Sequence, residues 1–238
     1  MADKTSQEII QSIVAAELYE ETGEKAPRPR GIKADGTAIP LVTVSRFFGA
    51  QGTEVSRLLA ERLGVQLYDR ELLKAVAMEA KADPAVMEQL DEKVTGLVDD
   101  VMQSFLNKRG GTSKDMFYRA MIKVVLGIGQ ANGGVIVGRG AHLLLPRQKA
   151  FRLRIDGSMQ KCAERVAGNL HIRKRRAKEL IEQTNKDRER FTRKIYETYP
   201  VESTYYDMLI STDYFSPAQV VNIVVTAMRE AGFDVPAA

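Results

Sequence analysis

The chain alternates short apolar runs with longer segments that have apolar residues at three- and four-residue spacing. The short runs predict strands and the longer segments predict helices. The predicted strands cover residues 41–44, 65–68, 135–137, 151–155 and 208–210. The predicted helices cover residues 53–63, 71–82, 85–107, 115–131, 159–170 and 176–196, and a last helix has Pro217 in its first turn and ends near Gly232. Because strands that alternate with helices favour a parallel sheet covered on both faces, the pattern predicts a three-layer α/β fold.

The first 40 residues follow a different pattern. Residues 5–21 have apolar positions on one side of a helix, but no neighbouring predicted element lies beside them in the sequence. Residues 22–40 are rich in glycine, proline and charge, which is the composition of a linker. We therefore expect an N-terminal helix and a flexible linker over residues 1–40 and a folded domain over residues 41–238. The helix either docks on a partner surface or frays, and the sequence leaves both open.

Composition limits the classes of protein that fit. Of the 238 residues, 44% are hydrophobic and 28% are charged, as in ordinary globular proteins. The formal net charge of +4 favours anionic ligands without requiring a nucleic acid. The apolar runs are too short to span a membrane and no apolar leader follows Met1, so we expect a cytoplasmic protein. The single cysteine cannot form an intramolecular disulfide and the two histidines have no zinc-site spacing, which leaves oxygen-bound Mg²⁺ as the metal to consider.

The loop after the first predicted strand is the first place to look for chemistry, because ligands of open α/β sheets bind at the carboxyl ends of the strands. Gly49 and Gly52 lie three residues apart in this loop, just before a predicted helix. Such glycines let backbone N–H groups converge on an anion, and the helix dipole adds to the attraction. The loop departs from the pattern G-x-x-x-x-G-K-[ST], since Arg46 and Gln51 stand at the two glycine positions and Gly52 at the lysine position. It is either a degenerate phosphate-binding loop or a purely structural turn.

Several segments, taken in order, resemble the cytidylate kinase-like family. The resemblance begins with VTVSRFFGAQGTEVSRLLAERLGVQLYDRELL, which has the Ser-Arg, the glycine-rich loop without lysine and the Tyr-Asp-Arg-Glu of that family. It continues with GVIVGRG at residues 134–140, which resembles the strand whose Gly-Arg holds a monophosphate. Residues 151–165, 179–190 and 206–211 resemble the next strand and helix, the arginine-bearing lid and the last strand. The resemblance covers about residues 41–232 and leaves the segment before it unexplained.

The resemblance implies a P-loop NTPase-like fold with a five-stranded parallel sheet, a helical insert at residues 84–130 and a helical lid at residues 171–195. The insert matches the family only loosely. The resemblance also implies that the protein binds ATP and Mg²⁺. The residues that would bind ATP are Gly49, Ala50, Gln51, Gly52, Thr53 and Glu54. Thr53 would in addition ligate Mg²⁺ through its hydroxyl, although it is equally suited to be a helix N-cap.

Arginines are the residues to examine for phosphoryl transfer, because the reaction needs positive charge more than covalent help. Arg46, beside the loop, is the candidate to replace the missing lysine, and by the resemblance Arg188 and Arg190 of the lid would join it in catalysis. The acceptor nucleotide would be bound by three residues, Asp69, Arg139 and Asp187, and Asp69 could instead bind a metal-bound water. Simpler roles stay open for all of them: a turn aspartate that caps the next helix, a loop arginine, and charges of a solvated helix face.

The sequence leads to one main hypothesis, a nucleoside monophosphate kinase-like enzyme that transfers the γ-phosphoryl group of ATP to a (d)CMP-type acceptor. The alternative is a nucleotide-binding regulatory protein of the same fold with weak or absent catalysis. A third hypothesis, nucleic-acid binding through the basic stretch at residues 173–194, has no recognised motif behind it. We therefore expect ATP and a nucleoside monophosphate as partners and no membrane, and we leave the oligomeric state open.

Overall fold

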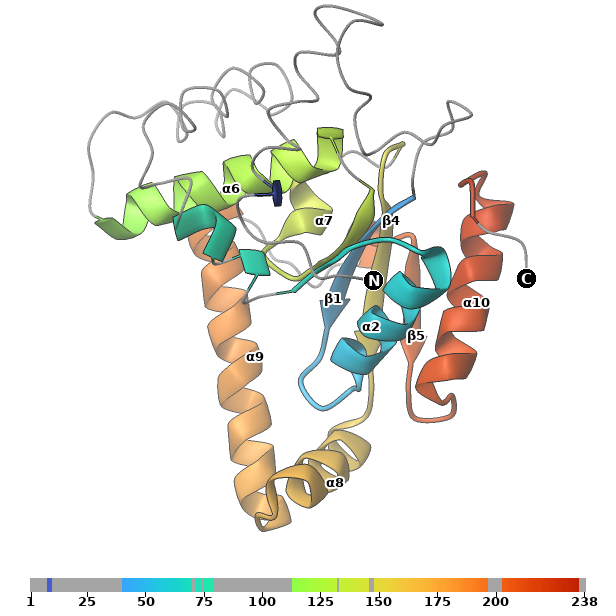
Figure 1. Cartoon of the computed structure of the whole chain (residues 1–238). Coiled ribbons are helices and arrows are strands. Elements are labelled where there is room, and N and C mark those ends of the chain that lie inside the picture. Colours follow the sequence, from blue (N-terminus) through green and yellow to red (C-terminus); the bar gives the residue numbers. More distant parts are fainter. Residues whose placement is uncertain are drawn as a thin grey trace, which may run out of the picture.

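The structure, a computed structural model, describes most of the predicted domain (Figure 1). The described residues are 8–9, 40–69, 72–73, 75–78, 113–131, 133–145, 148–196 and 203–235. Most of the predicted N-terminal helix, the linker and the predicted helix over residues 85–107 lie outside the described residues, as does part of the predicted helix over residues 71–82. Within the described segments, no helix has both the length and the apolar character needed to cross a bilayer.

Strands and helices alternate along the described chain as predicted. The elements are β1 (Leu41–Arg46), α2 (Gly52–Leu63), β2 (Leu67–Tyr68), α6 (Ser113–Ala131), β3 (Gly134–Val137), α7 (Ala141–Leu144), β4 (Phe151–Asp156), α8 (Met159–Leu170), α9 (Lys174–Tyr196), a 3₁₀ turn (Ser203–Tyr205), β5 (Met208–Ser211) and α10 (Pro217–Glu230). β2 is shorter than predicted, because only its last two residues pair with β3. α7 was not predicted from the sequence pattern, and it begins directly after Gly140, a residue with a φ of 69°.

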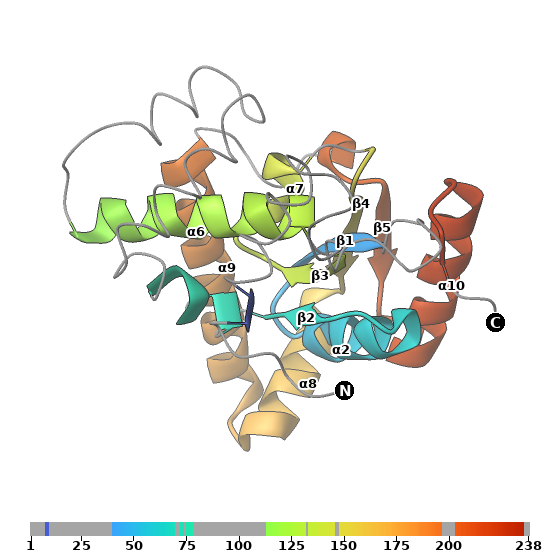
Figure 2. The same cartoon turned by 45° about the horizontal axis from the view of Figure 1, so that its top comes forward.

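The five strands form one parallel sheet in the order β2-β3-β1-β4-β5. α6 and α7 lie on one face of this sheet, and α2 and α10 lie on the other (Figure 2). The predicted three-layer α/β fold is therefore confirmed. The register places Val44 of β1 beside Val137 of β3, and Ser45 beside Arg154 of β4. The carboxyl ends of these three strands consequently share one edge of the sheet.

Apolar side chains on both faces of the sheet hold the layers together. Val42 and Val44 are buried in a cluster with residues of α2, α8 and α10. On the opposite face, Leu41 and Ile136 belong to a cluster with residues of α6 and α7. Burial on both faces explains why these strands are short continuous apolar runs in the sequence. β4 differs, since its buried residues alternate with half-buried charged ones.

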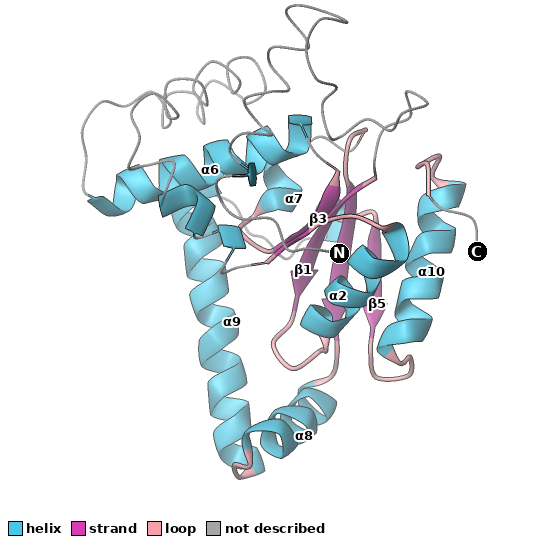
Figure 3. Ribbon diagram, in the orientation of Figure 1, coloured by secondary structure: helices cyan, strands magenta, loops and turns pink. Residues whose placement is uncertain are grey.

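α8 and α9 form an arm that leaves the carboxyl end of β4 and returns to the β1–α2 loop (Figure 3). Ser158 caps α8 by accepting a hydrogen bond from the N–H of Lys161 at 3.3 Å. His171 ends α8 in the left-handed region, with a φ of 54°, so the chain reverses there. α9 then runs past the carboxyl ends of the strands. The predicted lid, residues 171–195, corresponds to this corner and to α9.

Candidate functional site

A cavity of about 450 Å³ lies at the carboxyl ends of β1, β3 and β4, between α7 and α9. Its charged lining consists of four arginines and one carboxylate: Arg46, Arg139, Arg154, Arg188 and Asp187. A second cavity of about 430 Å³ lies on the β5 side, where Ser211 lines it. Three arginines line both cavities: Arg46, Arg154 and Arg188. The excess of guanidinium groups makes this edge of the sheet a place where an anionic ligand is favoured.

The β1–α2 loop brings the start of α2 to the same edge of the sheet. Gln51 is the N-cap of α2, in the left-handed region with a φ of 54°, and its side chain forms no capping hydrogen bond. Thr53 lies inside the first turn, so its alternative role as the N-cap is wrong. The first N–H groups of a helix have no partner within the helix. Because Gln51 leaves them uncapped, they and the helix dipole are suited to bind an anion.

Both loop glycines are required by close packing. A Cβ on Gly49 would lie 2.8 Å from Cβ of Cys162, and the φ of Gly49 is +89°. A Cβ on Gly52 would lie 2.5 Å from Cβ of Arg46. Thr212, after β5, fixes the same loop by donating from its hydroxyl to the carbonyl of Ala50 at 3.1 Å. The glycines thus have a structural role whether or not the loop binds phosphate.

The Arg46 side chain crosses from the β1–α2 loop to the end of β3. Its Cβ and Cγ lie over the α-carbon of Gly52, and its Nη1 is 2.7 Å from the position that a Cβ on Gly138 would occupy. Arg46 is the last residue of β1, and its side chain brings a positive charge to the wall of both cavities. The aliphatic stem of Arg46 thus passes the position where the usual pattern has a lysine, Gly52, while its guanidinium lies at the end of β3.

Arg139 occupies a sharp turn at the end of β3. Its φ of 58° lies between the positive φ angles of Gly138 and Gly140, 78° and 69°. Its guanidinium lies over the ring of Phe191 of α9, with the central carbon 5.2 Å from the ring centroid. The strained turn thus directs the side chain of Arg139 toward the cavity that α9 covers.

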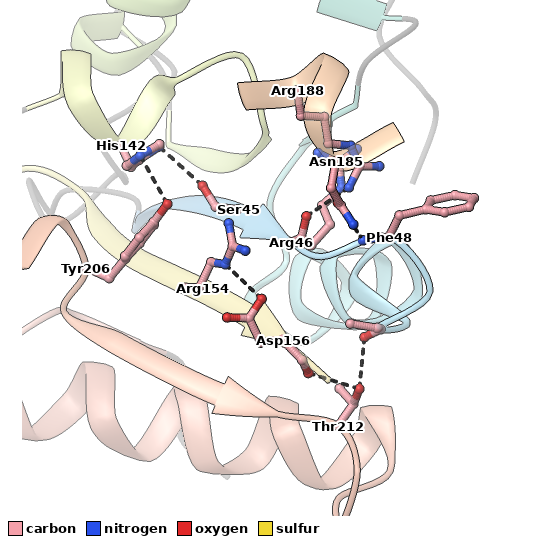
Figure 4. A network of polar contacts seen from close by, with 11 residues as sticks. Ser45, Arg46, Phe48, His142, Arg154, Asp156, Asn185, Arg188, Tyr206 and Thr212 are labelled. Carbon is pink, nitrogen blue, oxygen red and sulfur yellow. Dashed lines mark hydrogen bonds and ion pairs between the residues drawn. The ribbon is translucent and has the colours of Figure 1, made fainter. Parts of the chain in front are cut away.

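α9 is seated on the β1–α2 loop by two of its residues, one turn apart (Figure 4). Asn185 Oδ1 accepts a hydrogen bond from the N–H of Phe48 at 3.1 Å. Arg188 Nη1 donates to the carbonyl of Arg46 at 2.8 Å, and its guanidinium lies over the Phe48 ring at 5.6 Å. These contacts hold α9 against the β1–α2 loop, beside both cavities.

A buried polar network lies beneath the larger cavity. Ser45 Oγ is 3.2 Å from His142 Nδ1, and the Tyr206 hydroxyl is 3.2 Å from His142 Nε2 (Figure 4). The rings of His142 and Tyr206 are stacked, with centroids 4.8 Å apart. In a catalytic triad the serine faces the histidine Nε2 and a carboxylate holds Nδ1, whereas here Ser45 faces Nδ1 and the tyrosine hydroxyl faces Nε2. This arrangement therefore orients Ser45 and His142 without forming a triad.

The structure brings together only part of the predicted site. Four predicted residues line the larger cavity: Arg46, Arg139, Arg188 and Asp187. Arg190 does not line either cavity and forms an exposed ion pair with Asp187 at 3.2 Å.

Two further predicted residues have local partners outside the cavities. Asp69 Oδ1 accepts from the N–H of Leu72 at 2.9 Å, which is the capping role that the sequence left open. Glu54 pairs with Arg57 at 2.7 Å on the exposed surface of α2, and the hydrogen bond from Arg57 lowers the pKa of the Glu54 carboxyl. Neither Asp69 nor Glu54 lines the two cavities.

Several polar residues of the larger cavity were not predicted from the sequence: Ser45, His142, Arg154, Thr184 and Thr192. A signal for Arg154 was present, because the alternation of apolar and basic residues in 151–155 places its side chain on the polar face of β4. Ser45 and His142 give no comparable signal, since they meet only through the packing of α7 on β1.

The described residues at this edge of the sheet could hold Mg²⁺ only together with phosphate oxygens of a ligand. In the described part of the chain, no three His, Cys, Asp or Glu side chains gather as a metal site would require. Thr53 is exposed on the first turn of α2 and offers a single hydroxyl. Mg²⁺ is commonly held by one or two protein groups together with substrate phosphates. The described residues are compatible with that second arrangement.

Similarity to one solved structure supports the fold, and a second solved structure is too distant to add support. An uncharacterized protein from Eubacterium ventriosum ATCC 27560 has a TM-score of 0.65 at 19% identity, over 81% of this chain and 99% of that chain. A shikimate kinase from Bacteroides thetaiotaomicron has a TM-score of 0.46 at 12% identity, over 80% of this chain and 98% of that chain. Among curated proteins, none is similar enough to count as a match.

A protein-family model gives a more specific result. The model of the cytidylate kinase-like family matches residues 41–214, which span β1 to the loop after β5. The match includes the loop at Gly49 and Gly52, the turn at Arg139 and the whole of α9. This protein therefore belongs to the cytidylate kinase-like family.

Proposed function

We propose that this protein transfers the γ-phosphoryl group of ATP to a nucleoside monophosphate, with a (d)CMP-type nucleotide as the expected acceptor. The observation that carries the proposal is the cavity with four arginines and one carboxylate at the carboxyl edge of the sheet. Phosphoryl transfer is catalysed mainly by positioning and by positive charge around the migrating group. Membership of the cytidylate kinase-like family supports a nucleotide as the ligand.

The donor is assigned to the loop side of the site. The uncapped start of α2 would receive phosphates of ATP, and Arg46 would supply the charge that lysine gives in the usual loop. Mg²⁺, brought in with ATP, would neutralise phosphate charge, with Thr53 as the hydroxyl available to it.

The acceptor is assigned to the larger cavity. Arg139 would bind its phosphate, since the side chain lines the cavity and is held on the Phe191 ring. Arg188 lines both cavities and would stand between donor and acceptor.

In the proposed reaction, an oxygen of the acceptor phosphate forms the new bond to the γ-phosphorus, and the bond from that phosphorus to the bridging oxygen of ADP breaks. The attacking phosphate is an anion, so no proton has to be removed.

A coupled assay that detects ADP, with CMP, dCMP and UMP as acceptors, tests the proposal. The variant Arg139→Gly removes the guanidinium and keeps a residue that tolerates the φ of 58°. Loss of a hydrogen bond to a charged group predicts a fall in kcat/KM of about 10- to 100-fold. The control is Arg175→Gln, whose side chain is 92% exposed on α9 and should change nothing. Absence of turnover with every acceptor overturns the kinase proposal.

A specific observation also favours the second candidate, a nucleotide-binding protein without catalysis. α9 occupies the N–H of Phe48 and the carbonyl of Arg46, so the Phe48 N–H is engaged by Asn185 and does not face a phosphate. This candidate predicts that ATP raises the melting temperature while no ADP forms over hours. Release of ADP that depends on the acceptor excludes it.

A further inference from the structure

β4 carries charged residues on one face of an interior strand. Phe151, Leu153 and Ile155 are buried, whereas the residues between and after them are half-buried: Arg152, Arg154 and Asp156. β4 lies between β1 and β5, a position in a parallel sheet where both faces are ordinarily apolar. Charges at such a position are costly unless they have partners. The partners of Arg152, Arg154 and Asp156 therefore indicate the role of each charged side chain.

Arg152 has structural partners. Its Nη2 donates to the carbonyl of Leu145, just after α7, and its backbone N–H donates to Asp207 Oδ2 at 2.8 Å. Arg152 lines neither of the two cavities. It ties the start of β4 to α7 and to the loop before β5.

Arg154 is placed differently. Its Nε donates to Asp156 Oδ1 at 2.9 Å, and its side chain is only 14% exposed. Within the described part of the chain, this is its one hydrogen bond, so both terminal amino groups keep their donors for another partner. Arg154 lines both cavities, and Figure 4 shows its guanidinium between Ser45 and Asp156. A nearly buried guanidinium fork that faces two cavities is suited to an anion.

The residues shared by the two cavities mark the boundary between them. Arg46 and Arg188 reach this boundary from the loop and from the lid, and Arg154 reaches it from the sheet. If ATP phosphates lie on the loop side and the acceptor in the larger cavity, the γ-phosphoryl group has to cross this boundary. The inference that follows rests on that proposed function.

We propose that Arg154 contacts the γ-phosphoryl group and is a further catalytic residue of this site, and that Asp156 is its positioning residue. The carboxylate on Nε fixes the plane of the guanidinium and leaves its two terminal amino groups to donate to oxygens of the γ-phosphoryl group. During transfer, the bond to the acceptor oxygen forms and the bond to the ADP oxygen breaks. Arg154 stays protonated throughout, because its role is to stabilise negative charge on the oxygens that do not react.

The test compares binding of ATP and ADP by calorimetry, so that it does not depend on turnover. The wild type should bind ATP more tightly than ADP, and Arg154→Gln should reduce that preference by about tenfold or more, with a similar fall in kcat. Arg154→Lys keeps the charge and loses the fork, so it should restore only part of the preference. Arg152→Gln is the matched control on the same face of β4, and it should keep the preference within about twofold even where it lowers the melting temperature.

Asp156→Asn tests the positioning role. Asparagine can still accept from Nε without the charge, so this variant should keep binding and lower kcat less than Arg154→Gln does, whereas Asp156→Ala should resemble Arg154→Gln.

The outcomes separate this inference from the proposed function. The role of Arg154 is overturned if both Arg154 variants keep the wild-type preference for ATP over ADP. It is also overturned if Arg152→Gln loses as much of that preference as Arg154→Gln does. A wild type that binds ATP and yields no product refutes the proposed reaction, while the binding comparison still decides the contact of Arg154. A wild type that binds neither nucleotide refutes both.

Discussion

Gly52 determines where the charge of Arg46 lies. The Arg46 side chain fills the space that a Gly52 side chain would need, with a would-be Cβ 2.5 Å from Arg46 Cβ and 2.8 Å from its Cγ. Neither of these atoms is the movable end of the arginine, so the backbone or the whole side chain would have to shift. The absence of a side chain at this position therefore allows Arg46 to cross to the end of β3.

Gly52→Ala should displace Arg46 and weaken the loop. We expect the free energy of unfolding in urea to fall by about 1–3 kcal/mol, the usual cost of overpacking, and ATP binding to weaken with it. Gly168→Ala is the control, because a Cβ there meets nothing within 4 Å in α8. It should raise stability by up to about 1 kcal/mol through helix propensity. Equal stability of the two variants would contradict the packing argument.

Cys162 is the one cysteine of the chain, and its backbone supports the β1–α2 loop. Burial raises the pKa of its thiol from 9.0 to about 11, with a smaller opposing effect from Arg165. The thiol therefore stays protonated at neutral pH, whereas the thiolate is the form that reacts.

We expect iodoacetamide to modify the folded protein at about pH 8 at least tenfold more slowly than the urea-unfolded chain. Because the unfolded thiol ionises first, stability should also decline as the pH rises between 9.0 and about 11. Modification of the folded protein at the rate of the unfolded chain would exclude a buried thiol.

At the scale of elements, α9 is the part that completes the site. Its inner side brings Asn185 and Arg188 to the loop and Phe191 to Arg139. In its first turns Ala177 and Ile181 are buried, while the outer side carries exposed ion pairs of Arg175 and Arg176 with Glu179. The same helix therefore packs on the cavities at one end and presents a solvated charged face near the α8 corner.

The hydrogen bond from Phe48 to Asn185 gives a direct measure of this docking. Asn185→Ala removes the acceptor, so amide exchange at Phe48 should become about tenfold faster, because the loop loses its tie to α9. Arg176→Gln, which removes an exposed ion pair of the same helix, should leave this exchange rate unchanged. Hydrogen–deuterium exchange read by NMR or on peptides covering the loop measures both. An unaltered rate in Asn185→Ala would show that α9 does not hold the loop in solution.

At the scale of the whole molecule, the sheet separates two apolar clusters and leaves its carboxyl edge for chemistry. The apolar clusters hold the layers in place, while the charged groups gather where three strands end. A ligand at that edge contacts β1, β3, β4 and α9 at once, so its binding should stabilise the fold as a unit.

Nucleotide binding should therefore raise the melting temperature. A ligand at 100 times its Kd stabilises a protein by about 2.7 kcal/mol, which for a chain of this size corresponds to roughly 5–10 °C. We expect ATP with Mg²⁺ to give such a shift, and Arg139→Gly to lose the shift that CMP gives while keeping most of the shift that ATP gives. If neither nucleotide moves the melting temperature of the wild type, nucleotide binding at this edge is refuted.

The sequence by itself determined the fold class and most of the described elements, although α7 was not predicted. Strands buried on both faces leave short apolar runs, and helices leave a three- and four-residue spacing, so β1, β3, β4, α8 and α10 could be located within a few residues. Arg139 could be singled out because it stands between two glycines at a strand end, and Arg46 because it begins the glycine-containing loop that lacks a lysine. These signals are local, since a strand or a turn constrains the residues that form it.

Only the tertiary structure decided which of these residues meet. Arg188 contacts the carbonyl of Arg46 across 142 residues of sequence, while Arg190, two positions further along α9, is turned to solvent. Arg154 joined the site because the strand order places β4 beside β1. Such contacts depend on strand order and on the rotation of a helix about its axis, and these are set by the packing of whole layers. No local period in the sequence records that packing.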